Sequence, residues 1–381
     1  MNIKLFVFAI QLTLFVEKII EIPIFYNFGT YDMKITIGNS NRYKILSLNM
    51  ESDFIFFNYF SFKWLDSSVK RIGDETSMDI LGEKADVQLI FTKIYLEDKN
   101  YTKIDNIYLY HVSVFTELSE FDSFPLSFKT KNESFSPIEL LYKTNQIDKR
   151  GFGLLYDINE ENGTLFIGSF PSELIVNQYK FQYRISIPVN ESYSTWGCTL
   201  KEVVFHNNSF KVEKYAFFQA NKEFIIVSRD FLKYLSNNFF KGYMKNGTCS
   251  FNSNKEKIQC ECDYINNFPN LTFNFDGHII EIANKNLFRQ SNNNCLFTLQ
   301  SYCNNWIFGI SFLNLYFSYF DYDNKKIVFY SNTPFHFQTK QISYIYYLII
   351  INIIQMSICI VCFFYIKIMF NGYKSNSFNN L

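Results

Sequence analysis

The chain has 381 residues, with 36 Lys and Arg against 36 Asp and Glu, so its formal net charge is zero. A neutral chain has no basic surface for nucleic acid and no net field to steer charged ligands, which argues against a nucleic-acid-binding function. Aromatic residues make up 20% of the chain, whereas it has only 14 Gly and 7 Pro. This composition favours strands over helices, and the length fits one large β architecture or two to three ordinary domains.

The N-terminus predicts a secretory signal peptide over residues 1–20. Lys4 precedes the apolar run 5–16, LFVFAIQLTLFV, which is too short to span a bilayer and has the length of a signal core. A buried strand is the alternative interpretation of this run. Cleavage is expected between Glu17 and Glu21, although no small-x-small site marks it.

Strand patterns follow along the chain. Apolar residues alternate over 33–37, the pair Gly38-Asn39 supplies a turn, and a second apolar strand over 43–48 ends at Asn49. The pattern is weakest over 63–123. Further on, it predicts a helix near 140–147, a hairpin over 153–168, crossing strands over 179–200, a strand at 224–227 with a helix at 231–240, and a hairpin within 306–330 that turns at Asp323-Asn324.

The run Tyr344–Ile366 predicts a transmembrane helix, because it carries no charged residue and about 20 helical residues cross about 30 Å of hydrocarbon. Lys367 and Lys374 follow in a short tail, 367–381, as expected on the cytoplasmic side. A signal peptide with one C-terminal span predicts a single-pass type I membrane protein, with its ectodomain in the secretory lumen or outside the cell. A lipid-anchor signal is the alternative, but the basic residues after the span argue against it.

Cysteines and glycosylation acceptors agree with that compartment. Six of the eight cysteines precede the span, and an even number in a secretory protein predicts disulfides. A zinc site is disfavoured, because Cys260-x-Cys262 is tighter than the usual ligand spacing, and neither a metal nor a cofactor is expected. The Asn-x-Ser/Thr acceptors are Asn100, Asn132, Asn162, Asn190, Asn207, Asn246 and Asn270.

The run Trp306–Tyr330, WIFGISFLNLYFSYFDYDNKKIVFY, resembles the closing motif of the pepsin-like aspartic proteases. The residues in register are Trp306, Gly309, Phe312, Leu313, Tyr316, Phe320, Asp321, Asn324, Lys326 and Ile327. The resemblance covers roughly residues 31–331, and it is poor between the first hairpin and Gly153. It implies a mainly β, bilobal fold of two six-stranded-type lobes, 26–176 and 177–335, with a cleft between them and the transmembrane helix after them.

The same resemblance implies a disulfide. The segment Cys262–Gly277 is similar to a family motif whose Cys pairs with one just ahead of the closing motif, which implies the bridge Cys262–Cys295. The pairs Cys249–Cys260 and Cys198–Cys303 would then remain. Sequence alone does not choose among connectivities.

The resemblance also implies that the catalytic residues are lost. The family activates water with two carboxylates that share a proton. Their positions are matched to Asn49 and Ser228, and neither side chain provides a carboxylate. Glu51 stands where the family has a Gly, Ile310 where it has Asp or Asn, and the flap region 82–91 lacks the expected Tyr.

The expected function is therefore that of a membrane-anchored, catalytically degenerate member that binds a peptide or a protein. The alternative is an active aspartic endopeptidase that uses Glu51, Asp53 or Asp230. Arg229 beside Asp230 argues against this role for Asp230, which is expected instead to open the following helix. A hydrolase with another nucleophile is disfavoured, since none of the four His residues lies in a recognisable catalytic motif.

Overall fold

The computed structural model describes residues 353–356 and residues 17–337, apart from 28, 40–42, 59–68, 81–82, 115–121, 130–134, 158–160, 173, 207, 253–256, 292–293 and 302–304. The predicted signal core, the cytoplasmic tail and all of the predicted span but 353–356 therefore lie outside the described residues. Residues 353–356 are helical, and none of the helices described is long and apolar enough to cross a membrane. The described residues up to His336 belong to one compact unit, and those after it belong to a second.

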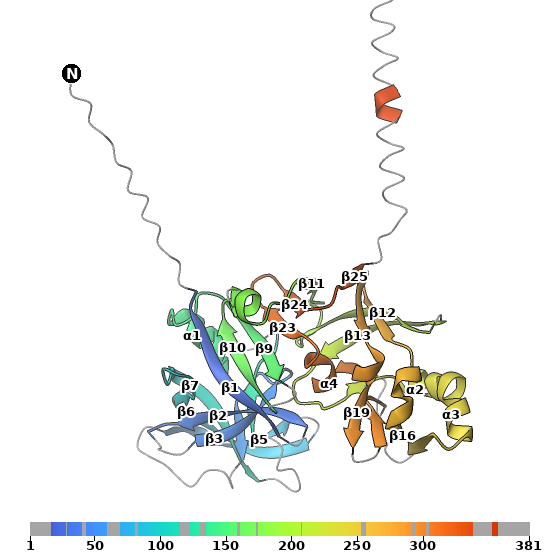
Figure 1. The fold of residues 1–381 in the computed structure, drawn as a ribbon. Coiled ribbons are helices and arrows are strands. Elements are labelled where there is room, and N and C mark those ends of the chain that lie inside the picture. The colour runs from blue at the N-terminus through green and yellow to red at the C-terminus, as the bar shows by residue number, and fades with distance from the viewer. Residues whose placement is uncertain are drawn as a thin grey trace, which may run out of the picture. The chain divides into compact units, whose positions relative to one another are not determined.

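The largest sheet has 13 strands and joins the two halves of the chain (Figure 1). Strand β1 pairs with β10 on one side and β2 on the other, so one continuous sheet runs through both of the expected lobes. In spatial order the strands are β11 (Tyr183–Pro188), β24 (Lys326–Ser331), β23 (Phe317–Asp321), β9 (Gly151–Asp157), β10 (Asn162–Gly168), β1 (Ile19–Asn27), β2 (Thr30–Ile37), β3 (Tyr43–Asn49), β8 (Ser123–Pro125), β4 (Phe56–Asn58), β7 (Lys103–Val114), β6 (Glu83–Leu96) and β5 (Lys70–Ile80).

Two further sheets belong to the second half of the chain. The eight-stranded one runs β21 (Leu299–Gln300), β14 (Ile225–Ile226), β22 (Trp306–Phe308), β13 (Asn208–Phe218), β12 (Gly197–Phe205), β17 (Leu271–Phe275), β18 (His278–Ile282) and β25 (His336–Phe337). The four-stranded one runs β15 (Cys249–Asn252), β16 (Lys257–Glu261), β20 (Asn294–Phe297) and β19 (Phe288–Ser291). The fold is thus mainly β and bilobal, as expected.

Short helices connect the strands. They are α1 (Pro137–Lys143), η3 (Leu174–Gln178), α2 (Arg229–Leu235), η4 (Ser236–Phe240), α3 (Lys241–Lys245), η5 (Cys262–Asn267), η6 (Asn284–Leu287) and α4 (Ile310–Leu313). The lobe boundary predicted at 176/177 falls inside η3, between β10 and β11. The signal boundary predicted at residue 20 falls inside β1, where Ile19 and Ile20 already pair with Gly168 and Ile167. The signal-peptide boundary at residue 20 stays a prediction.

An aromatic cluster packs the two halves together. The Trp196 side chain is fully buried, and its ring lies 4.9 Å from Phe128 and 5.2 Å from Phe320, measured between centroids. Its Nε1 donates a hydrogen bond to Leu126 O at 2.7 Å. Trp196 thus contacts both Leu126, which directly follows β8, and the closing hairpin. Its indole N–H has a hydrogen-bond acceptor inside the core.

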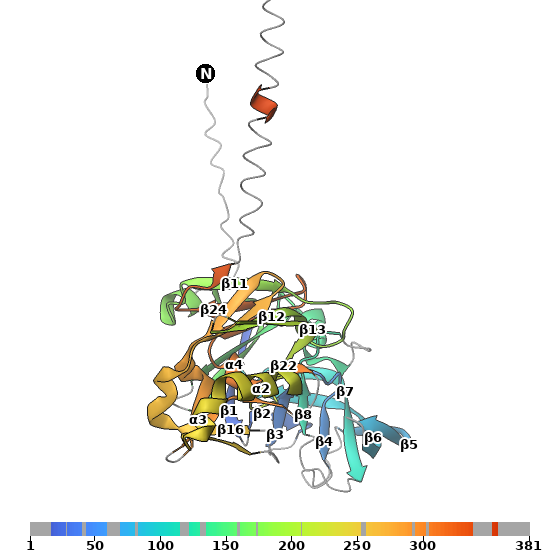
Figure 2. The same ribbon diagram turned by 90° about the vertical axis from the view of Figure 1, so that its right-hand side faces the viewer.

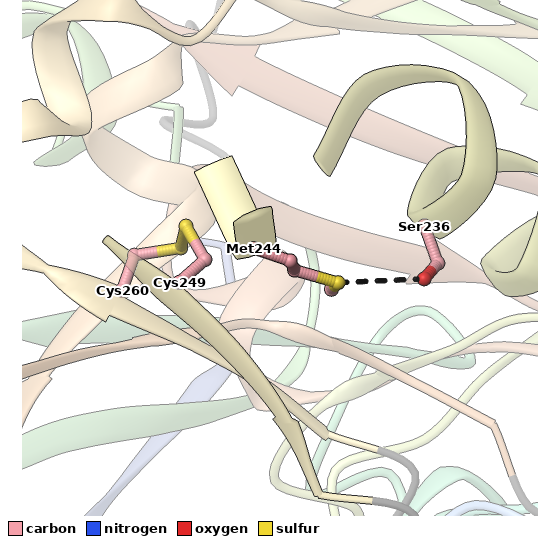
Figure 3. Close-up of a disulfide and its surroundings, with 4 residues drawn as sticks. All are labelled: Ser236, Met244, Cys249 and Cys260. Carbon is pink, nitrogen blue, oxygen red and sulfur yellow. Dashed lines mark hydrogen bonds between the residues drawn. A yellow bond between two sulfur atoms is a disulfide. The ribbon is translucent and has the colours of Figure 1, made fainter. Parts of the chain in front are cut away.

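Two disulfides staple the four-stranded sheet, namely Cys249–Cys260 and Cys262–Cys295. Figure 3 shows the first beside α3, where Met244 Sδ accepts a hydrogen bond from Ser236 Oγ. Both bridges match predicted pairs. The pairing of Cys198 with Cys303 is wrong, because Cys198 is a free thiol buried in the hydrophobic core. Cys303 itself lies outside the described residues.

The predicted glycosylation acceptors fall in different settings. Asn132 and Asn207 lie outside the described residues. Asn190 is partly buried, and the other four, Asn100, Asn162, Asn246 and Asn270, are exposed. Exposed acceptors have room for a glycan, so glycosylation there stays a prediction.

Candidate active site

The two halves of the chain repeat one arrangement of four strands. In the first half, β3 runs parallel to β8, and β4 runs parallel to β7 and antiparallel to β8 (Figure 2). In the second half, β13 runs parallel to β22, and β14 runs parallel to β21 and antiparallel to β22. The end of β3 at Asn49 therefore corresponds to the end of β13, which Gln219 follows. We call residues 49–55 the first loop and residues 219–224 the second loop.

The first loop is organised by the Asn49 side chain, which is 7% exposed. Its Oδ1 accepts hydrogen bonds from Glu51 N at 2.9 Å and Ser52 N at 3.0 Å. Ser52 Oγ in turn donates to Phe54 O at 2.7 Å. Asn49 thus closes a tight turn and has no acidic proton to exchange.

The second loop contacts the first through one polar pair. Gln219 is 1% exposed, and its Nε2 donates a hydrogen bond to Glu51 Oε1. Gln219 Oε1 and Asn221 Oδ1 are buried and have no hydrogen-bond partner in the described part of the chain. Burial raises the pKa of the Glu51 carboxyl, while the charge of Lys222 and the hydrogen bond from Gln219 act in the opposite direction.

The closing motif holds the second loop from behind. Ile310 N donates to Lys222 O at 2.7 Å, and Ser311 N donates to Glu223 O at 2.9 Å. A Cβ on Gly309 would lie 2.2 Å from Lys222 O, so this close approach requires glycine. The motif that is most recognisable in the sequence therefore shapes the second loop.

Strands β1, β2 and β19 hold the other side of the second loop. Tyr31 N of β2 donates to Ala220 O at 3.2 Å. Tyr26 of β1 donates from its hydroxyl to Glu223 Oε1 at 3.0 Å and accepts from Arg289 Nη1 of β19 at 2.9 Å. Arg289 also forms an ion pair with Glu223. The second loop is thus fixed to both halves of the chain.

The structure corrects the predicted position of the second catalytic residue. Ser228 follows β14, the strand after the second loop, and its Oγ accepts a hydrogen bond from Phe231 N at 3.4 Å as the N-cap of α2. The residue equivalent to Asn49 is Gln219. Asp230 does not open α2, since that role falls to Ser228, and it is exposed in the first turn.

The three proposed substitute carboxylates do not converge. Asp53 Oδ1 accepts a hydrogen bond from Ser127 Oγ at 2.8 Å, and Asp230 lies exposed on α2. Glu51 is the one of the three that reaches the second loop. Among the described residues, the side-chain hydrogen bond that joins the two loops involves one carboxyl group, that of Glu51, and the amide of Gln219, so it is not a carboxylate pair sharing one proton.

A sequence signal for Gln219 was present. The run Ala216-Phe217-Phe218 is apolar, as the strand before the family's second catalytic loop is. The order Asp, Ser/Thr, Gly, Ser/Thr is kept neither at 219–222 nor at 228–231, so the two runs match the family equally poorly. The later run, Phe224–Val227, is longer and more apolar. For that reason the second catalytic position was predicted at residue 228, nine positions after Gln219.

Comparisons with known proteins agree with the mainly β, bilobal fold. A family model described as "Eukaryotic aspartyl protease" matches residues 118–331, which is more than half of the chain. The chain is similar in structure to an aspartic proteinase from Irpex lacteus, with a TM-score of 0.66, 12% identity, and coverage of 84% of this chain and 99% of that one. It is also similar to conglutin gamma, "a unique basic 7S globulin" from lupine seeds, with a TM-score of 0.69, 11% identity, and coverage of 83% and 96%. A search of curated protein sequences finds no match.

Proposed function

The chain belongs to the eukaryotic aspartyl protease family, and on that premise we propose that it is a catalytically inactive, membrane-anchored member that binds a peptide or a segment of a partner protein. One observation carries the proposal. The two strand ends that present the family's catalytic aspartates carry Asn49 and Gln219, and Glu51 bridges to Gln219. Neither amide takes a proton from water at physiological pH, so the shared-proton mechanism has no pair of carboxyl groups to work with.

Retention of the surrounding framework supports a binding role. The family holds extended peptides through backbone hydrogen bonds and apolar pockets, and neither requires the aspartates. Asn221 Oδ1 has no hydrogen-bond partner among the described residues, so it can receive an N–H group of a bound chain once the loops adjust. One structurally similar protein is described as a globulin, which is in keeping with the rule that a fold does not dictate an activity.

The competing function is an active endopeptidase centred on Glu51. It is favoured by the raised pKa of the Glu51 carboxyl, which burial shifts toward the range in which an acid and its base form are both accessible. It lacks a second carboxyl group at the loop junction among the described residues. The two functions therefore make opposite predictions about peptide cleavage.

The deciding experiment uses the purified full-length protein, a mixed peptide library from acid to neutral pH, and a pepstatin-type inhibitor as a binding probe. We expect no cleavage and saturable inhibitor or peptide binding. Cleavage that is lost in Glu51→Ala and kept in the matched control Asp230→Ala would establish the active endopeptidase instead. Absence of both cleavage and binding would contradict a peptide-binding role.

Membrane anchoring is tested separately. The proposal rests on the apolar, charge-free run Tyr344–Ile366. We expect the full chain to remain in the membrane pellet after alkaline carbonate extraction and a chain ending at 337 to be released. Release of the full chain would contradict the anchor without bearing on the binding role.

A further inference from the structure

The contact between Glu51 and Gln219 is chemically incomplete in its charged form. A carboxylate only accepts hydrogen bonds, whereas a glutamine amide has an N–H group that donates and a carbonyl that accepts. The Gln219 N–H group is satisfied by Glu51 Oε1. The Gln219 carbonyl oxygen is buried with no donor among the residues that the structure describes, and leaving such an acceptor unsatisfied is unfavourable.

One added proton completes the pair. A protonated carboxyl group has one O–H donor besides its carbonyl acceptor, so it matches both groups of an amide at once. Glu51 Oε1 keeps the hydrogen bond from Gln219 Nε2, and a proton on Glu51 Oε2 is donated to Gln219 Oε1. The proton comes from solvent, and only the new O–H bond forms.

We propose that Glu51 and Gln219 form a proton-binding site that joins the first and second loops, with two hydrogen bonds in acid and one at neutral pH. Asn49 and Gln219 mark the two strand ends at this junction, so the site couples the two halves of the chain to pH. Acidification holds the loops together, and neutral pH loosens them. This regulation needs no bound ligand and therefore goes beyond the proposed binding function.

The surrounding charges set the sign of the effect. Lys222 on the second loop is the charged group that acts on Glu51 and favours its ionised form. Glu223, the next residue, is already paired with Arg289 and Tyr26, and Asp53 on the first loop is bonded to Ser127. Burial outweighs Lys222 and raises the pKa of Glu51 above its ordinary 4.5.

A carboxyl group whose pKa is higher in the folded than in the unfolded protein stabilises the fold fully below the unfolded pKa. That contribution is lost as pH rises through the folded pKa. The variant Glu51→Gln is a mimic of the protonated state, because an amide at residue 51 also offers one donor and one acceptor to Gln219. We therefore expect Glu51→Gln to retain the acid-state contact at every pH.

The test measures thermal unfolding of the full-length protein against pH, without peptide, for wild type, Glu51→Gln and the exposed control Asp230→Asn. We expect a higher unfolding temperature for Glu51→Gln than for wild type at neutral pH, and a difference that shrinks as pH falls. Asp230→Asn should follow wild type throughout. A difference between Glu51→Gln and wild type that does not change with pH would overturn the proposal.

A second measurement does not depend on the variant folding well. In wild-type protein labelled with ¹³C-Glu and ¹⁵N-Gln, the Glu51 carboxyl and the Gln219 side-chain amide should titrate with one common midpoint above 4.5, the ordinary value for Glu. A Glu51 midpoint at or below that value, or a Gln219 amide that is insensitive to pH, would refute the site. Neither result affects the peptide-binding proposal, whose assay detects a ligand.

Discussion

Asn49 and Gln219 occupy equivalent positions in the two halves of the molecule. Asn49 ends β3, which is parallel to β8, and Gln219 directly follows β13, which is parallel to β22. Each residue also has a backbone hydrogen bond across this pairing, since Asn49 O accepts from Leu126 N at 2.8 Å and Gln219 N donates to Phe308 O at 3.1 Å. The family model that matches this chain describes aspartyl proteases, which use two carboxylates, whereas these two positions hold amides.

Asn49 is predicted to be structural. Replacing it with Ala removes the acceptor for the N–H groups of Glu51 and Ser52, and we expect a loss of about 1–3 kcal/mol in the free energy of unfolding. Asn49→Asp keeps an acceptor oxygen and should retain most of that stability at neutral pH. Denaturant unfolding measures both variants. An Asn49→Ala protein as stable as wild type would contradict this role.

Ser228 is predicted to act as a helix cap with no part in the site. Ser228→Ala removes the N-cap hydrogen bond to Phe231 N of α2, which should lower the free energy of unfolding by about 0.5–2 kcal/mol. Inhibitor or peptide binding, measured by calorimetry under native conditions, should be unchanged. A loss of binding with unchanged stability would mean that the second site residue had been misplaced.

Gly309 is predicted to tolerate no side chain. A Cβ there would meet Lys222 O at 2.2 Å and Phe224 O at 2.4 Å, which are backbone atoms of the second loop. Gly309→Ala should therefore destabilise the protein by about 3 kcal/mol, near the upper end for overpacking. Gly242→Ala is the matched control, because a Cβ at that helical position meets nothing within 4 Å, and it should stabilise by up to about 1 kcal/mol. Similar effects from both changes would count against the close contact.

The two disulfides are predicted to differ in their contribution to stability. Cys262–Cys295 closes a sequence separation of 33 and Cys249–Cys260 one of 11, and the chain-entropy model gives about 4 and about 3 kcal/mol respectively. Replacing each pair with Ser and measuring the unfolding free energy tests this order. A larger loss from the shorter loop would show that native packing, and not chain entropy, dominates.

Cys198 is predicted to be an unreactive free thiol. It lies in the core, and burial raises the pKa of its thiol well above the usual range, so little thiolate forms at neutral pH. We expect alkylation at Cys198 only after denaturation, located by mass spectrometry of a non-reduced digest. A peptide linking Cys198 to Cys303 in that digest would instead establish the disulfide that the sequence predicted for these two residues.

The local sequence determined the framework. The closing hairpin was predicted from its aromatic strands and its turn residues, and in the structure Asn324 N donates to Asp321 Oδ1 at 2.9 Å inside that turn. The bridge Cys262–Cys295 was implied by the resemblance of the segment Cys262–Gly277 to a family motif. The hairpin depends on short-range geometry, because turn type and strand periodicity are encoded within a few residues.

Only the tertiary structure decided the site. Two apolar runs, 216–218 and 224–227, are each followed by a candidate loop, and the longer and more apolar of the two is not the one that leads into the second loop. The choice is made by the parallel pairing of Ala216–Phe218 with Trp306–Phe308, residues that are distant in sequence. The tertiary structure also decides the contact between Glu51 and Gln219, which joins loops from opposite halves of the chain. It decides the state of Cys198 as well, which is a buried free thiol although the even number of cysteines predicted a disulfide. These outcomes depend on which distant segments pair and pack together, and not on the conformational preference of any one segment.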